Sequence, residues 1–183
     1  MKIKGAILAA AVAAAASPVY ADATQWSGLS FGATVSNARV SGGGQGSTNR
    51  LGLALRGGYN WAVGENLVVG AHANAMDLSG ANGGRGGPNI RRIYDVRLQV
   101  GYTLGNGLLY AGIGAAQGAM GAAGNRHDGS VVAFGFQSPM IDHVDFQVEV
   151  ASYHFQSGGG GGAGPGGGNP QSMMLTVGFV YRH

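Results

Sequence analysis

The stretch Tyr94-Asp95-Val96-Arg97-Leu98-Gln99-Val100-Gly101-Tyr102 alternates apolar side chains with polar or small ones. Successive side chains of a β-strand point to opposite sides, so a period of two indicates a strand with one apolar and one polar face. An α-helix would instead repeat its apolar residues every three or four positions. The stretch therefore predicts a strand whose two faces meet different surroundings.

The same alternation recurs along the chain and predicts eight strands. They span residues 27–40, 51–61, 67–74, 94–102, 108–118, 130–137, 144–151 and 173–182. The connections alternate between short links at 62–66, 103–107 and 139–143 and longer, glycine-rich links at 41–49, 79–88, 121–128 and 156–170. This asymmetry is typical of an up-and-down barrel with tight turns at one end and longer loops at the other. We therefore expect an all-β, eight-stranded antiparallel barrel.

Composition separates a membrane-spanning barrel from a soluble one of the lipocalin type. The 183 residues are 45% apolar and only 10% charged, and 37 of them are glycine. The polar faces of the strands carry few charges: Arg56, Asp95, Arg97, Gln147 and Glu149 are their main polar members. A polar face that looked outward into water would carry many more charges. The interpretation favoured here is a transmembrane barrel with its polar face inside, and the soluble barrel is the rival.

Aromatic residues on the apolar face support the membrane hypothesis. They lie beside the short links or the chain end and comprise Tyr59, Trp61, Tyr102 and Tyr181. Aromatic side chains gathered at one level of an apolar band form the interface girdle of membrane barrels. No later stretch approaches the roughly 18 consecutive apolar residues of a membrane-spanning helix.

The beginning of the chain has the features of a secretory signal peptide. Lys2 and Lys4 precede an apolar run over residues 6–16, and small residues follow up to Ala21. We expect residues 1–21 to be removed, with Ala23 as the alternative cleavage position, and residues 22–183 to form the barrel. That barrel has no lysine, and its nine arginines against eight acids leave a net charge of +1. Nucleic acid is therefore excluded as a partner, because its binding requires a strongly basic surface.

The residue inventory argues against catalysis and against a cofactor. With no cysteine, the chain has no disulfide, thiolate metal site or thiol nucleophile. The five histidines lack a metal-ligand spacing, so we expect no metal. The candidates for a catalytic set are His127 with Asp128 and Ser130, and His154 with Ser157. Neither has a supporting third group at a predictable position, so the sequence predicts a non-enzymatic protein.

Charged residues of the polar face are predicted to meet inside the barrel. Arg56 lies five residues before Trp61, Arg97 five before Tyr102, and Glu149 five after Val144. Equal distances from the short links place these three side chains at one depth, with Asp95 one layer further out. An eight-stranded barrel is just wide enough to be filled by side chains, so these groups should pair as an ionic cluster. His72 is expected in the same region.

The last strand, Leu175-Thr176-Val177-Gly178-Phe179-Val180-Tyr181-Arg182, resembles that of small bacterial outer-membrane β-barrels, the opacity-type and OmpA/OmpX-like porin-family surface proteins. The resemblance implies the cell outer membrane as the location, and outer-membrane lipid and the outer-membrane assembly machinery as partners. It also implies an assembly signal formed by Phe179, Tyr181 and the terminal residue, which is His183 here in place of the usual aromatic residue. The expected function is that of a structural or surface protein whose mobile, glycine-rich extracellular loops meet an extracellular ligand or surface. A narrow passive pore for small solutes is the alternative, and a lipid-modifying enzyme is the third hypothesis.

Overall fold

A computed structural model describes residues 22–42, 45–78, 90–120, 125–156 and 171–183. One 3₁₀ turn, η1 (Ala23–Trp26), precedes eight strands in this part of the chain. The strands are β1 (Gly28–Gly42), β2 (Gln45–Ala62), β3 (Leu67–Asp77), β4 (Ile90–Leu104), β5 (Gly107–Met120), β6 (Asn125–Ile141), β7 (Val144–Phe155) and β8 (Gln171–Arg182). Each predicted strand lies within or almost within one of these.

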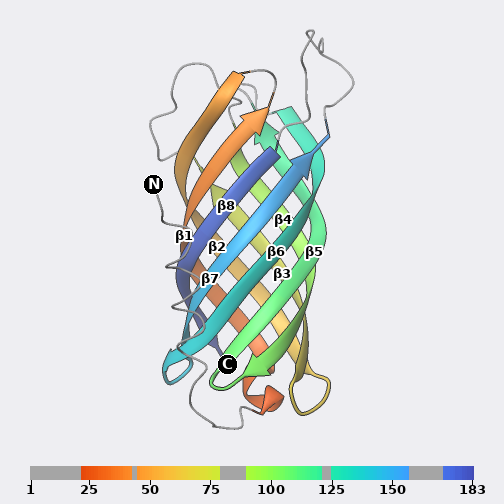
Figure 1. The fold of residues 1–183 in the computed structure, drawn as a ribbon, viewed down its shortest axis with the longest axis vertical. Helices are drawn as coiled ribbons and strands as arrows, with labels where there is room; N and C mark the ends of the chain where they lie inside the picture. Colours follow the sequence, from red (N-terminus) through yellow and green to blue (C-terminus); the bar gives the residue numbers. More distant parts are fainter. Residues whose placement is uncertain (1–21, 43–44, 79–89, 121–124, 157–170) are drawn as a thin grey trace.

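The strands form a closed antiparallel barrel in which each pairs with its neighbours in sequence and β1 pairs with β8 (Figure 1). The β1–β8 seam extends from Ser30 opposite Arg182 to Ser41 opposite Gln171. A closed barrel has no free sheet edge, so wherever neighbouring strands overlap their backbone donors and acceptors are paired within the wall. The predicted eight-stranded up-and-down barrel is confirmed.

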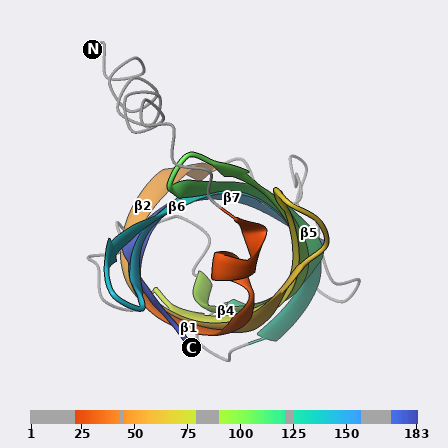
Figure 2. The same cartoon turned by 90° about the horizontal axis from the view of Figure 1, so that it is seen from below.

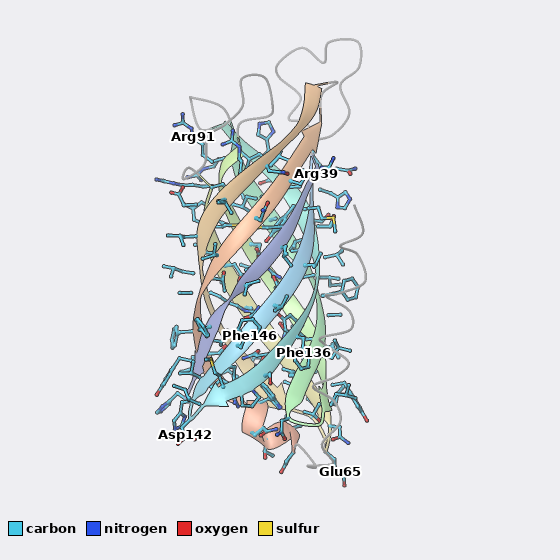
Figure 3. All side chains as sticks on the ribbon, turned by 60° about the vertical axis from the view of Figure 1, so that its left-hand side comes forward. Arg39, Glu65, Arg91, Phe136, Asp142 and Phe146 are labelled. Carbon is cyan, nitrogen blue, oxygen red and sulfur yellow. The ribbon has the colours of Figure 1, made fainter. Side chains whose placement is uncertain are left out.

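The apolar half of each alternation faces outward. Leu53, Leu55 and Leu98 are 69%, 67% and 65% exposed, whereas the polar residues next to them are buried inside. Charged side chains gather at the two ends of the outer surface, with Arg39 and Arg91 at one end and Glu65 and Asp142 at the other, and Phe136 and Phe146 lie between them (Figure 3). Apolar residues on the outside and polar residues on the inside are the reverse of a soluble barrel, so that rival hypothesis is wrong.

No helix among the described residues is long and apolar enough to cross a bilayer.

The two ends of the barrel differ in their connections. The turn end carries η1 and the links 63–66, 105–106 and 142–143. Positive φ angles of 56° at Gly105 and 63° at His143 allow two of these links to reverse the chain within two residues. The far end carries the other four connections, which include segments 43–44, 79–89, 121–124 and 157–170. These segments lie outside the described residues, and with them most of the predicted long loops.

Several strands extend beyond the alternating pattern toward the far end. The predicted long link at 41–49 is wrong, because β1 and β2 stay paired up to Gly42 opposite Gln45. Residues 125–128, also predicted as a loop, belong to β6. At the turn end, β6 continues through Pro139 to Ile141, and a register shift there accommodates the proline. Backbone pairing does not require alternating apolar side chains. Strand ends that extend beyond the apolar part of the outer surface therefore show no period of two in the sequence.

Candidate functional site: the closed lumen

Glu149 on β7 lies between two arginines at the centre of the barrel. Its Oε2 is 3.0 Å from Nη1 of Arg56 on β2, and its Oε1 is 2.7 Å from Nη1 of Arg97 on β4. All three side chains are buried, with Glu149 only 4% exposed. The structure therefore brings together the three groups for which the sequence predicted one depth.

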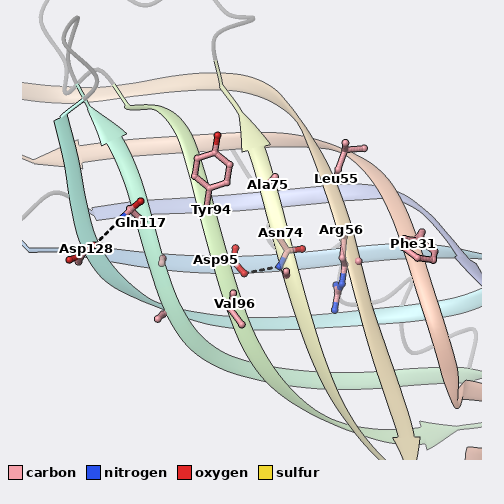
Figure 4. Close-up of a pocket in the computed structure, with 14 residues that line it drawn as sticks. Phe31, Leu55, Arg56, Asn74, Ala75, Tyr94, Asp95, Val96, Gln117 and Asp128 are labelled. Carbon is pink, nitrogen blue, oxygen red and sulfur yellow. Dashed lines mark hydrogen bonds between the residues drawn. The ribbon is translucent and has the colours of Figure 1, made fainter.

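Asp95 completes this group, which we call the central ionic cluster: Arg56, Asp95, Arg97 and Glu149. Arg97 donates from Nε to Oδ1 of Asp95 at 2.8 Å and from Nη2 to Oδ2 at 3.1 Å. Asn74 donates to the same carboxylate at 2.7 Å. Arg56, Asn74 and Asp95 occupy three adjacent strands and point to the same side (Figure 4). Within this cluster two arginines face two carboxylates, so its formal charge is balanced.

Neutral side chains that the sequence did not predict for this site complete its hydrogen bonding. The Tyr110 hydroxyl donates to Glu149 at 2.9 Å, and the Tyr153 hydroxyl donates to Asp95 at 2.8 Å. Arg56 also donates to Gln99 Oε1 at 2.6 Å. The one sequence feature that could have identified these residues is an aromatic or amide side chain on the polar face of a strand. With these partners the buried charges are hydrogen-bonded as well as paired, which limits the penalty for removing them from water.

The His72 side chain also lies in the lumen, where the sequence placed it. Its Nδ1 accepts a hydrogen bond from Arg56 Nε at 3.3 Å, and its Nε2 lies 2.9 Å from Asn60 Oδ1. The Nδ1 contact requires the neutral ring with the proton on Nε2, which then donates to Asn60. His72 therefore acts here as a hydrogen-bonded wall residue beside the cluster.

Glycines in the wall make room for the large lumen side chains. A methyl group at Gly135 would overlap the Tyr110 ring, and one at Gly58 would overlap the His72 imidazole. A strand glycine often marks such a close approach of another group. At these two positions the glycine thus leaves room for a side chain that fills the lumen.

The turn end of the lumen is closed by η1, which lies within the barrel outline when viewed from that end (Figure 2). Trp26 is fully buried, and the Arg182 guanidinium lies 4.4 Å from its ring centroid. Arg182 also donates to the Gln25 carbonyl and to both carboxylate oxygens of Asp145, one of them at 2.8 Å. This arrangement joins the segment before β1 to β7 and β8.

The exposed N-terminal side of η1 is capped by Asp22. Its carboxylate accepts a hydrogen bond from the Thr24 backbone N–H at 2.9 Å, which lowers the pKa of Asp22 below its ordinary value. The Ala23 N–H donates to the Glu65 carbonyl, also at 2.9 Å. Residues 22 and 23 therefore both take part in closing the turn end.

Toward the far end the lumen becomes apolar. We call this cluster of buried side chains, which pack against one another, the apolar chamber, and its described members include Ala38, Val40, Met76, Leu78, Ile90, Ile93, Phe155 and Met174. One charged residue, Arg50 on β2, lies among them and is only 7% exposed. The lumen thus has two different buried environments along its axis.

A shallow groove of about 700 Å³ crosses the outer wall from β1 to β6 (Figure 4). Its wall is formed by small residues such as Ala73, Ala75 and Ala115, and bulkier side chains such as Leu55 and Tyr94 flank them. Gln117 donates to Asp128 at its margin. The groove is mainly apolar, in contrast to the lumen behind it.

The predicted girdle residues all lie on the outer face near the turn end. Tyr59, Trp61, Tyr102 and Tyr181 are each about half exposed, and the rings of Tyr59 and Trp61 lie 4.8 Å apart. Phe179 is on the same face of β8, 6.1 Å from the Phe146 ring. The His183 N–H donates to the Leu29 carbonyl at 3.0 Å and so extends the β1–β8 seam.

The first predicted catalytic set, His127 with Asp128 and Ser130, is separated in the structure. Asp128 and Ser130 are on the outer face of β6, whereas His127 points to the other face because adjacent strand residues alternate. His154 is the cross-strand neighbour of Ser130, but no hydrogen bond joins them among the described residues. Ser157 lies outside the described residues. No group of three or more metal-ligating residues occurs in the described part of the chain.

The family model for the outer membrane protein beta-barrel domain matches residues 6–182. The chain therefore belongs to this family and is a protein of the cell outer membrane. No curated protein sequence matches significantly.

The solved structure of Neisserial surface protein A agrees with this assignment at the level of the fold: it is 16% identical with a TM-score of 0.59, over 86% of this chain and 98% of that one. The attachment invasion locus protein Ail of Yersinia pestis is 16% identical with a TM-score of 0.49, over 86% and 99%. OprG from Pseudomonas aeruginosa is 13% identical with a TM-score of 0.45, over 86% and 96%.

Proposed function

We propose that this protein is a non-enzymatic structural or surface protein of the outer membrane, with a lumen closed to solutes. The observation that carries the proposal is the central ionic cluster. At its level Arg97 and Gln147 are each 2% exposed, so side chains fill the cross-section. The η1 segment closes the turn end in addition.

In this proposal the turn end faces the periplasm and the far end faces outside the cell, as the resemblance implies. The connections of the far end are then the part that meets an extracellular ligand or surface, because a filled barrel serves as their support. The half-exposed aromatic residues near the turn end would lie at the membrane interface, in contact with outer-membrane lipid.

Conductance in a planar lipid bilayer tests the closed lumen. The unmodified protein should give no steady conductance, whereas Glu149→Ala, which removes the group between two arginines, should admit ions. Val148→Ala, one residue away on the outer face, is the matched control and should behave like the unmodified protein. Steady conductance by the unmodified protein, equal to that of Glu149→Ala, would favour a passive pore instead.

The lipid-modifying hypothesis is tested at Ser130, which has His154 beside it on the outer face. Neither purified protein nor Ser130→Ala should hydrolyse phospholipid or transfer its acyl chains. Turnover by the unmodified protein that disappears in Ser130→Ala would contradict the non-enzymatic proposal.

We also propose that the last strand is the segment recognised during assembly. Residues 179–182 pair with residues 30–33 of β1, and Arg182 binds Asp145. Deletion of residues 179–183 should therefore abolish insertion, because it leaves β1 with unpaired backbone groups in the membrane, at several kcal/mol each. His183→Phe should assemble at least as well as the unmodified chain. A truncated protein that reached the outer membrane in a heat-modifiable folded form would contradict this role.

A further inference from the structure

Arg50 is a buried cation without a carboxylate partner among the described residues. It lies on the inner face of β2, and within the described residues its guanidinium makes one hydrogen bond, from Nη1 to the Ile90 carbonyl at 3.4 Å. Its Nε makes none. An uncompensated buried charge is strongly unfavourable, so a guanidinium in this position requires an anion.

The chain itself has no acid left to supply that anion. All eight acidic residues of the full sequence lie in the described segments, and each is engaged elsewhere or is distant. Asp77 and Asp128 are at the far end, but both are on the outer face, where Asp77 pairs with Arg92 and Asp128 accepts from Gln117. The remaining acids belong to the central ionic cluster or the turn end: Asp22, Glu65, Asp95, Asp142, Asp145 and Glu149. The chain therefore has no free carboxylate side chain for Arg50, and an anion that pairs with it would come from outside the chain.

A second unpartnered polar group lies close by on the same inner face. Ser172 on β8 is 1% exposed, and its hydroxyl makes no hydrogen bond among the described residues. Ser172 is opposite Val40 of β1, and Arg50 is opposite Ala38 of the same strand. The two groups therefore flank β1, at the far end of the lumen.

The surroundings of these two groups define the rest of a ligand. Ala38, Val40, Ile90 and Met174 belong to the apolar chamber, which gives a small inorganic anion no further polar contacts. An apolar body attached to the anionic group would instead pack against these side chains. Met76 and Met174 are unbranched, and such side chains adapt readily to a new neighbour.

We propose that the far end of the lumen binds an amphiphilic monoanion, a carboxylate with an apolar chain. The carboxylate pairs with Arg50, a single cation that matches a single negative charge, and accepts a hydrogen bond from the Ser172 hydroxyl. The apolar chain packs against the side chains of the apolar chamber, where Met76 and Met174 shift to admit it. The site is distinct from the central ionic cluster and does not require the lumen to conduct.

Octanoate binding to the folded protein in nanodiscs of zwitterionic phospholipid tests the proposal, with carboxyl-¹³C NMR as the readout and empty nanodiscs as the background. The unmodified protein should bind octanoate saturably. Arg50→Gln should weaken binding by about tenfold or more, as expected for loss of a charge-assisted pair. Arg39→Gln, at an exposed arginine on the outer face of β1 at the same end, is the matched control and should leave affinity unchanged.

Two further probes separate the parts of the ligand. Inorganic phosphate should bind far more weakly than octanoate, and octan-1-ol should bind equally to the unmodified protein and to Arg50→Gln. Equal affinity for phosphate and octanoate would contradict the proposal that the ligand has an apolar chain. Octanoate binding unaffected by Arg50→Gln would contradict the proposal that Arg50 binds the carboxylate. If Arg50→Gln does not fold, Arg50→Lys and Ser172→Ala take its place, and unchanged affinity in both would equally overturn it.

Discussion

Arg97 and Arg50 are both buried arginines of the inner wall, but their environments differ. Arg97 makes four hydrogen bonds, to Asp95, Glu149 and Tyr153, and is 2% exposed. Arg50 is 7% exposed and donates to one backbone carbonyl among the described residues. The Arg97 guanidinium is paired with carboxylates and hydrogen-bonded at all three nitrogens, whereas the Arg50 Nε has no partner among the described residues. Burial alone therefore does not define the role of a lumen charge, because the role depends on its partners.

The largest effect is expected at Glu149, where one side chain neutralises two arginines. Glu149→Ala should lower the free energy of unfolding by about 3 to 5 kcal/mol, because it leaves buried positive charge unpaired. Urea unfolding in a lipid bilayer measures this. Glu65→Ala makes the same chemical change at an exposed acid of the turn end and should stay within about 0.5 kcal/mol of the parent. Equal effects of the two substitutions would show that the cluster contributes no stability.

An arginine at residue 148, next to Glu149 but on the outer face, tests how much a charge depends on having a carboxylate partner. Val148→Arg should lower the free energy of unfolding by about 2 to 4 kcal/mol if residue 148 lies near the bilayer midplane, since no carboxylate faces it there. Leu104→Arg, beside the link at 105–106, should cost only about 0 to 1 kcal/mol. A Val148→Arg variant as stable as the parent would contradict the lipid-facing assignment of β7.

A smaller loss of stability is expected when a wall glycine beside the central ionic cluster is replaced by alanine. Gly135→Ala places a methyl group against the Tyr110 ring and should destabilise the barrel by about 1 to 3 kcal/mol. At Gly57 the same substitution would meet only the Phe31 ring at 3.6 Å, which is an ordinary contact. Gly57→Ala should therefore be neutral or stabilise the strand by up to about 1 kcal/mol. If the two variants have the same stability, the glycine at position 135 is not needed to make room for the Tyr110 ring.

The smallest effect, and the one of opposite sign, is expected at Arg50. Without added ligand, Arg50→Met should raise the free energy of unfolding by about 1 kcal/mol, because an apolar side chain replaces an unpaired buried charge. Arg97→Met should lower it, since Asp95 and Glu149 lose their partner. Destabilisation by both substitutions would show that the charge of Arg50, too, is compensated within the folded chain.

Much of this fold follows from the period of two. Alternation defines which side chains face outward, and distances from the short links are enough to put Arg56, Arg97 and Glu149 at one depth. These inferences succeed because inner and outer faces differ sharply in polarity. They depend on residues within a single strand and on its nearest link.

The parts that the sequence did not predict depend on contacts between strands. Tyr110 and Tyr153 reach the cluster through the curvature of the closed wall, so their partners are 39 and 58 residues away in sequence. The paired ends of β1 and β2 carry no apolar pattern, which is why 41–49 was predicted as a loop. The isolation of Arg50 emerges only when every acid has been placed in three dimensions.

The glycines of the inner wall also have a consequence for how this sequence tolerates variation. At Gly58 and Gly135 the missing side chain is the space that His72 and Tyr110 occupy. In a library of all single substitutions, even alanine should be depleted at these two positions, while alanine at Gly57 is tolerated. Variants that shorten the facing residue, such as Tyr110→Ala, should restore alanine at Gly135. The pattern of intolerant glycines would therefore trace the outline of the lumen side chains from genetic data alone.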